Sequence, residues 1–336
     1  MKLLKSILEA IKSPDNILLT ISVVCILTSL SLVIGTGYEE FSIYSIILSC
    51  VYLLPLFYLN FNTNLAYTIL ATICSFIIVL LLRGWVYTIL QFCIFWLPIV
   101  TAIMLFSLRR NFKDIFYVYL ELPNVLFIVL LVNITGIAIL IALFKYNPEA
   151  FIFIKNSFLQ KINDIISNNG LLSYDSIFQT TNIKTLLSNN FLLLFISCVS
   201  SYGLMFNIAN IYVGTKIAKK NIAAKFFYWP SDLRLPVSSL IIYPVAITIL
   251  VFGNYYPNLR ILATSSIITL SQTLFLCGLA YLHTITTDLP IRLIFLPIFY
   301  VVLFCTTYFS LPITIVILLM GVWSTIEHYK RTKTII

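Results

Sequence analysis

Charged side chains are scarce in this chain. Of its 336 residues only 10% are Asp, Glu, Lys or Arg, and histidine occurs twice. The long apolar runs contain essentially no charge, whereas an ion path or proton relay through a membrane normally includes a charged side chain. The sequence therefore argues against a proton-driven pump with a buried carboxylate.

Motifs for catalysis and metal binding are also missing from the sequence. His283 and His328 fit no metal-ligand spacing, and no Walker A loop, G-x-S-x-G elbow or paired in-membrane carboxylate occurs. The seven cysteines fall one to a hydrophobic segment without a C-x-x-C pair, which is typical of small apolar packing residues. We therefore expect a protein that is not an enzyme and has no cofactor and no metal.

Apolar residues make up 60% of the chain, and the mean hydropathy is +1.02. A membrane-spanning helix needs about 20 apolar residues, so the sequence predicts an all-α, polytopic transmembrane helix bundle with about ten spans (eight to ten). The expected partner is the lipid bilayer rather than nucleic acid. Whether 65–107 and 291–327 each hold two spans stays open. The predicted spans are residues 17–35, 43–59, 65–82, 85–107, 123–144, 190–213, 237–253, 260–282, 291–309 and 311–327.

The distribution of Lys and Arg predicts the orientation. With both termini cytoplasmic, 15 of the 21 basic residues lie on the inside, as the positive-inside rule requires. Residues 1–144 are then an N-terminal amphipathic helix plus five transmembrane helices. Residues 145–189 are an extracytoplasmic amphipathic segment, and residues 190–336 are five transmembrane helices with a basic C-terminal tail. Together they form one integral membrane domain.

Uncharged polar side chains in mid-span are the candidate site residues. On the span 190–213, Ser200, Gly203, Asn207 and Asn210 share one face through their i, i+3, i+7 and i+10 spacing. They could line a polar pocket, or they could join neighbouring helices by hydrogen bonds of about 0.6 kcal/mol each. The sequence leaves both interpretations open. The full candidate set is Gln91, Asn133, Asn207, Asn210 and Gln272, with Ser265 and Thr269 on the face of Gln272.

The stretch KFFYWPSDLRLP, residues 225–236, predicts a crossing point between water and lipid. Trp229 belongs to an aromatic group typical of an interfacial anchor, and Arg234 adds a positive charge on the inner side. Pro236 is expected near the first position of the next helix, after a non-helical turn. Asp232 and Arg234 are close enough in sequence to pair within that turn.

Three segments of the second half resemble a known family. They are the Arg234-Leu235-Pro236 turn, LFLCGLAYLH from Leu274 to His283, and GVWSTIEHYKR from Gly321 to Arg331. Together they resemble the YybS-like family of bacterial multi-pass membrane proteins. The resemblance implies location in the bacterial inner membrane and a multi-pass topology, but no reaction.

Two functions are compatible with these features. The first is a non-catalytic small-solute transporter, or a membrane-embedded substrate-binding subunit, for an unidentified small-molecule ligand; the spans, the prolines within them and the mid-span amides favour it. The second is an envelope scaffold or biogenesis factor that acts through other membrane proteins as partners. The missing buried charge and catalytic set favour the scaffold.

Overall fold

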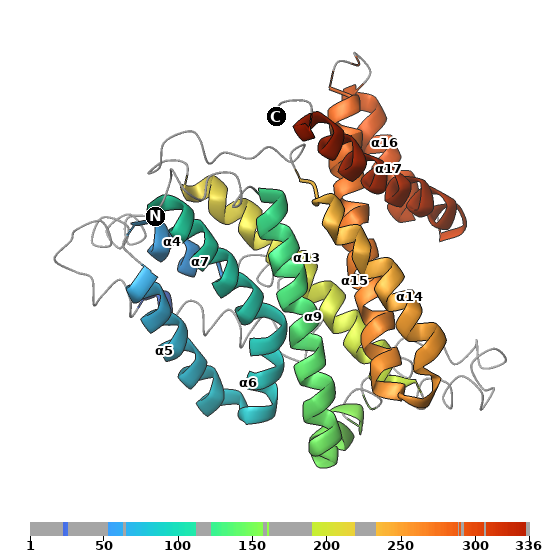
Figure 1. Ribbon diagram of the computed structural model, residues 1–336. Helices are drawn as coiled ribbons and strands as arrows, with labels where there is room; N and C mark the ends of the chain where they lie inside the picture. Colours follow the sequence, from blue (N-terminus) through green and yellow to red (C-terminus); the bar gives the residue numbers. More distant parts are fainter. Residues whose placement is uncertain are drawn as a thin grey trace.

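The computed structural model describes only part of the chain, and every regular element in that part is a helix (Figure 1). The all-α bundle predicted from the apolar runs is therefore confirmed. The described residues are 23–25, 53–62, 65–111, 122–156, 160, 190–218, 233–287, 289, 292–305 and 307–333.

The first half of the bundle is built from helices that pack side by side (Figure 1). The long helix through α6 and α7 changes to a short π-helix, η2, in its middle. The contacts of η2 with both α9 and α13 place this irregular turn inside the bundle. The helices of this half are α4 (Leu54–Asn62), α5 (Leu65–Arg83), α6 (Trp85–Gln91), η2 (Phe92–Trp96), α7 (Leu97–Asn111) and α9 (Leu122–Tyr146).

In the second half, α15 is the central helix. It contacts α9 from the first half and α13, α14 and α17 from the second, so it joins the two halves of the chain (Figure 1). The helices of this half are α13 (Phe191–Ala218), η6 (Val237–Ile241), α14 (Ile242–Phe252), η7 (Gly253–Tyr255), α15 (Pro257–Ile285), α16 (Arg292–Cys305) and α17 (Thr307–Lys333).

Five predicted spans coincide with helices that are long and apolar enough to cross a membrane. They are Leu65–Arg83, Trp85–Ser107, Leu122–Tyr146, Phe191–Val213 and Pro257–Ile285. The region 65–107 therefore holds two helices, separated at Gly84. Of the predicted spans 17–35 and 43–59, the structure describes only residues 23–25 and 53–59, so the total of about ten spans stays a prediction.

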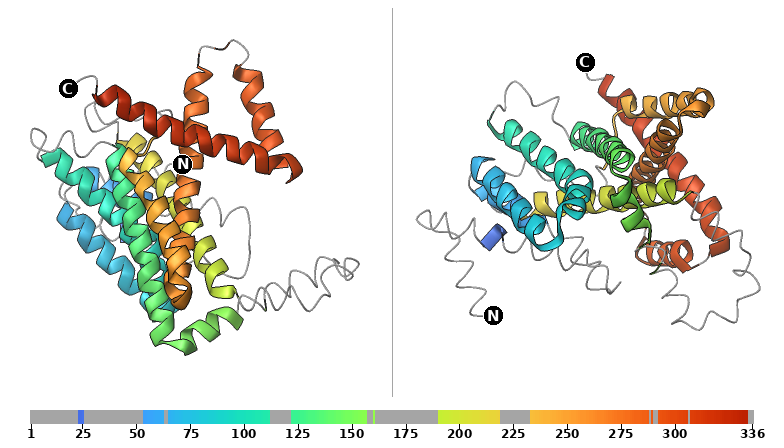
Figure 2. Two further views of the ribbon diagram at one scale, coloured as in Figure 1. Left: turned by 45° about the vertical axis from the view of Figure 1, so that its right-hand side comes forward. Right: turned by 90° about the horizontal axis from the view of Figure 1, so that it is seen from below.

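The other three predicted spans, 237–253, 291–309 and 311–327, coincide with helices whose apolar parts are short. The apolar parts of these helices, Val237–Phe252, Ile294–Leu303 and Pro312–Glu327, are each shorter than a usual span. The predicted start of the last span at residue 311, next to Pro312, is wrong, because Pro312 lies inside α17, which begins at Thr307. Pro312 has no N–H, so it cannot donate to the carbonyl four residues earlier. Helix α17 crosses α15 obliquely (Figure 2).

The first described residues of the segment 145–189 form a helix that covers one end of the bundle. The side chain of Asn147 accepts a hydrogen bond from the N–H of Ala150 at 3.1 Å, which caps the helix start. Phe151 then packs against Phe144 of α9 and Phe191 of α13, with ring centroids 5.9 and 5.8 Å away. The remainder of the predicted amphipathic stripe lies outside the described residues.

Replacing Gly84 by alanine is expected to lower the free energy of unfolding by about 1–3 kcal/mol, because φ of 82° with ψ of 169° is a backbone conformation essentially reserved for glycine. An added Cβ would meet no atom within 4 Å, so the effect is purely conformational. Thermal unfolding of the protein in detergent measures it. The control is Gly253→Ala, where φ is −85°. Equal melting temperatures for the two variants would contradict the prediction.

Candidate functional site

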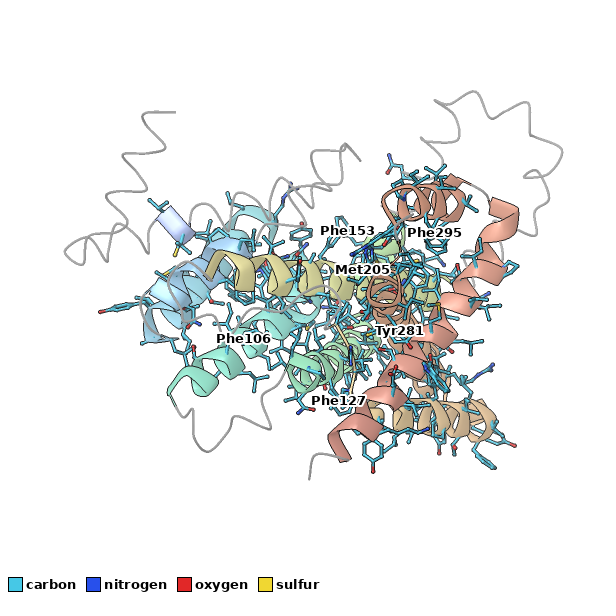
Figure 3. The ribbon with its side chains drawn as sticks, turned by 90° about the horizontal axis from the view of Figure 1, so that it is seen from above. Phe106, Phe127, Phe153, Met205, Tyr281 and Phe295 are labelled. Carbon is cyan, nitrogen blue, oxygen red and sulfur yellow. The ribbon has the colours of Figure 1, made fainter. Side chains whose placement is uncertain are left out.

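Uncharged polar side chains meet where α9, α13 and α15 are in contact, in a region crowded with side chains (Figure 3). The hydroxyl of Ser200 on α13 donates to Oδ1 of Asn133 on α9 at 2.6 Å, and lies 3.3 Å from Oγ1 of Thr269 on α15. One turn earlier, the hydroxyls of Ser197 and Ser265 are 3.0 Å apart. We call the following buried residues the polar seam: Asn133, Ser197, Ser200, Asn207, Ser265 and Thr269.

The side-chain amide of Asn133 has both a donor and an acceptor, but its neighbours can form a hydrogen bond with only one of them. Thr269 donates its one proton to the carbonyl of Ser265 at 2.6 Å. Ser200 can therefore donate to Asn133, or, with the amide turned over, accept from Asn133 and donate to Thr269. In both arrangements one polar atom of the amide has no partner among the described residues; in the structure it is Nδ2.

The π-helix η2 presents a backbone carbonyl to the seam because of Pro98. The N–H of Leu97 donates to the carbonyl of Phe92, five residues earlier, as is usual in a π-turn. Pro98 has no N–H, so the carbonyl of Ile94 lacks the donor that an α-helix would provide. Nδ2 of Asn207 on α13 donates to this carbonyl at 2.9 Å. Asn207 thus supplies the hydrogen bond that Pro98 removes.

Two glycines allow α9 and α13 to approach η2 closely. A Cβ added to Gly136 of α9 would overlap the carbonyl oxygen of Cys93, and one added to Gly203 of α13 would overlap the side chain of Ile94. Larger residues at these positions would push the helices apart. The glycines therefore hold η2 between α9 and α13, at the distance that the Asn207 hydrogen bond needs.

Two acceptor atoms near η2 are buried without a partner in the described part of the chain. Nδ2 of Asn207 must face the Ile94 carbonyl, so its Oδ1 is the atom left unpaired. Gln91 lies one turn before Ile94 and donates through Nε2 to the hydroxyl of Tyr87 at 3.1 Å, which leaves its Oε1 unpaired. Gln91 and Asn207 are 3% and 0% exposed, so bulk water does not reach these two oxygens to donate a hydrogen bond.

The other two predicted site residues lie apart from this group. Asn210 donates to the carbonyl of Phe206 at 2.8 Å and accepts from the N–H of Leu53 at 3.3 Å, so both ends of its amide are used in packing. Gln272 is half-buried, and its Oε1 has no partner among the described residues. No hydrogen bond within that part of the chain joins Gln272 to the polar seam.

The sequence missed one member of the polar seam and one further polar pair. Ser197 was not among the candidates, although it stands three residues before Ser200 on the same helical face. Ser107 on α7 donates to Oδ1 of Asn60 on α4 at 2.7 Å, and both are buried. Continuing the i, i+3 stripe by one turn would have found Ser197. No comparable signal marks Asn60.

The polar seam contains no charged side chain, and the described residues contain no candidate metal site. No group of three His, Cys, Asp or Glu residues that could hold a metal ion occurs where the structure is described. The polar seam consists of hydroxyl and amide groups alone. It can exchange hydrogen bonds with a neutral molecule, and it lacks a nucleophile activated by a base.

The predicted interfacial turn is described only in its second part. Residues 233–236 are non-helical, and Pro236 stands immediately before η6 with extended backbone angles (φ −71°, ψ 151°). Arg234 is half-buried. Trp229 and Asp232 lie outside the described residues, so the aromatic anchor and the Asp232–Arg234 pair stay predictions.

Comparison with known proteins identifies no relative. No family model, curated protein or solved structure matches the chain. The resemblance to the YybS-like family therefore stays a prediction.

Proposed function

We propose that this is a non-catalytic integral membrane protein that binds a small uncharged polar solute at the polar seam and η2. If it is a transporter, it also moves this solute across the membrane. The proposal includes about ten spans, both termini in the cytoplasm and location in the bacterial inner membrane. Five helices of spanning length and the basic inner loops support this membrane placement.

The observation that carries the proposal is the set of unpaired amide atoms on three helices. Gln91, Asn133 and Asn207 are all buried, and each leaves one polar atom without a partner among the described residues. Such an atom costs about 1–3 kcal/mol when nothing fills it. The fixed acceptor of Asn207, and the amides of Gln91 and Asn133 that can each be turned over, would suit a neutral molecule with its own N–H and carbonyl groups.

The irregular helix beside these atoms supports the same function. Broken helices with exposed backbone carbonyls commonly form the solute sites of transporters, near the middle of the membrane. Here η2 interrupts the helix of a predicted span and lies between α9 and α13, next to the unpaired amides. The lack of charge in the seam favours a neutral solute over an ion.

A ligand panel tests the proposal. The purified protein is heated in detergent with individual vitamins, nucleobases and amino acids, and a compound at 100 times its dissociation constant should stabilise it by about 2.7 kcal/mol. We expect Gln91→Leu and Asn133→Leu to reduce this stabilisation. The matched control is Thr248→Val on α14, because Thr248 is exposed and donates only to its own helix at Pro244.

The possible results separate the two hypotheses. Stabilisation that is lost in the Gln91 and Asn133 variants, and kept in Thr248→Val, supports solute binding at the seam. If no compound stabilises the protein, or if the seam variants respond like the unmodified protein, the amides serve helix packing and the scaffold alternative gains support.

A further inference from the structure

Arg234 carries a permanent positive charge, and its guanidinium has no hydrogen-bond partner at Nε among the described residues. This Nε atom is buried. Leu235, the next residue, is completely buried, which holds the non-helical segment 233–236 firmly in place. An arginine does not lose its proton in proteins, so the charge cannot be removed by titration. Because Arg234 is only half-buried, a group from outside the described residues can reach it.

A second unpaired group occurs close by in sequence. Ser239 lies in η6, and its N–H donates to the carbonyl of Pro236 at 2.9 Å. Its hydroxyl is fully buried and has no partner in the described part of the chain. The guanidinium of Arg234 and the hydroxyl of Ser239 are five residues apart in sequence and each has an unused donor, and an anion with several oxygens can accept from more than one donor.

The position along α15 indicates the depth of this site. Arg234 lies within electrostatic reach of Cys277, about two turns before α15 ends at Ile285. The 29 residues of α15 exceed the roughly 20 that cross the apolar layer, so its last turns reach the headgroup region. Arginines near the ends of spans extend their charge to that region, where lipid phosphates lie.

We propose that Arg234, assisted by Ser239, binds a phosphate group, supplied either by an anionic phospholipid or by a free phosphate anion. The planar guanidinium can donate two parallel hydrogen bonds to phosphate oxygens, which an ammonium cannot. The site is separate from the polar seam, so its test does not depend on the proposed solute function.

The experiment compares the full-length protein in a maltoside detergent, which contains no phosphate, with and without added phosphatidylglycerol. We expect a higher melting temperature with phosphatidylglycerol, and Arg234→Gln should bind this lipid about tenfold more weakly in native mass spectrometry. Arg234→Lys should keep part of the response. The control Arg260→Gln removes an equal charge from an exposed position at the other end of α15 and should respond like the unmodified protein.

A second arm identifies the source of the phosphate. Inorganic phosphate is compared with chloride at equal ionic strength in the same maltoside detergent without added lipid. Stabilisation by phosphate that equals the effect of phosphatidylglycerol and needs Arg234 identifies a soluble anion. Stabilisation by the lipid alone identifies a headgroup. If neither stabilises the protein, the proposal is wrong.

Two further variants test the proposal if Arg234→Gln does not fold, and test whether Arg234 forms an ion pair with Asp232 instead. Ser239→Ala removes an unpaired buried hydroxyl; we expect it to weaken the phosphatidylglycerol response while leaving the protein folded, which keeps the test open should Arg234→Gln fail to fold. A purely structural Ser239 would leave the lipid response unchanged and contradict its role. Asp232→Asn tests whether Arg234 pairs with Asp232 instead. Loss of the lipid response in Asp232→Asn to the same degree as in Arg234→Gln would overturn the phosphate site.

Discussion

Gly278→Ala is expected to destabilise the protein by about 3 kcal/mol, although alanine favours a helix over glycine by about 1 kcal/mol. A Cβ at Gly278 of α15 would overlap the carbonyl oxygen of Ile317 on α17. The contact is reciprocal, because a Cβ at Gly321 of α17 would overlap the carbonyl oxygen of Leu274 on α15. The obstacle in each case is backbone, which cannot move away as a side chain can, so the two helices would have to separate.

The matched control for this crossing is Gly253→Ala. The same atom is added there, but its closest neighbour, Cγ2 of Ile249, would be at 3.6 Å, an ordinary contact. Thermal unfolding in detergent should show a clear loss for Gly278→Ala and Gly321→Ala and almost none for the control. The double variant should cost less than the sum, since the first alanine already separates the helices. A Gly278→Ala protein as stable as the control would show that α15 and α17 do not touch here.

Most of the long helices could be predicted from the sequence, since an apolar run of spanning length has few other stable structures. The predicted bounds of α5, α9 and α15 agree with the observed bounds to within three residues at each end. At Pro312 the local rule failed, because a helix can continue past one lost hydrogen bond. Helix crossings such as that of α15 with α17 depend on which helices meet, and apolar patterning does not specify this.

The candidate site was only partly predictable for a similar reason. The spacing of Ser200 and Asn207 predicted that the two share a face of α13, and both are buried in the structure. Asn207 and its acceptor Ile94, however, are 113 residues apart, and no local pattern relates them. Pro98 was the available signal: its missing N–H indicates that the carbonyl of Ile94 needs another donor. It does not indicate which helix supplies that donor.

Asn207→Leu is expected to destabilise the protein by about 1–3 kcal/mol, because it removes the donor to the Ile94 carbonyl and leaves that carbonyl buried and unpaired. It should also abolish stabilisation by any solute found with the ligand panel. Asn210→Leu is the matched comparison on the same helix. Its amide is already fully paired with Phe206 and Leu53, so this variant should lose stability without changing the solute response.

A double-mutant cycle with Pro98→Ala isolates the role of Asn207. Alanine at position 98 restores a backbone N–H, which can donate to the Ile94 carbonyl within its own helix. Asn207→Leu should therefore destabilise the Pro98→Ala protein less than it destabilises the protein with proline, and a coupling energy of about 1 kcal/mol is expected. The general damage caused by each substitution cancels in the cycle. Equal losses in the two backgrounds would mean that Asn207 does not replace the hydrogen bond that Pro98 removes, and that η2 is held by Gly136 and Gly203 alone.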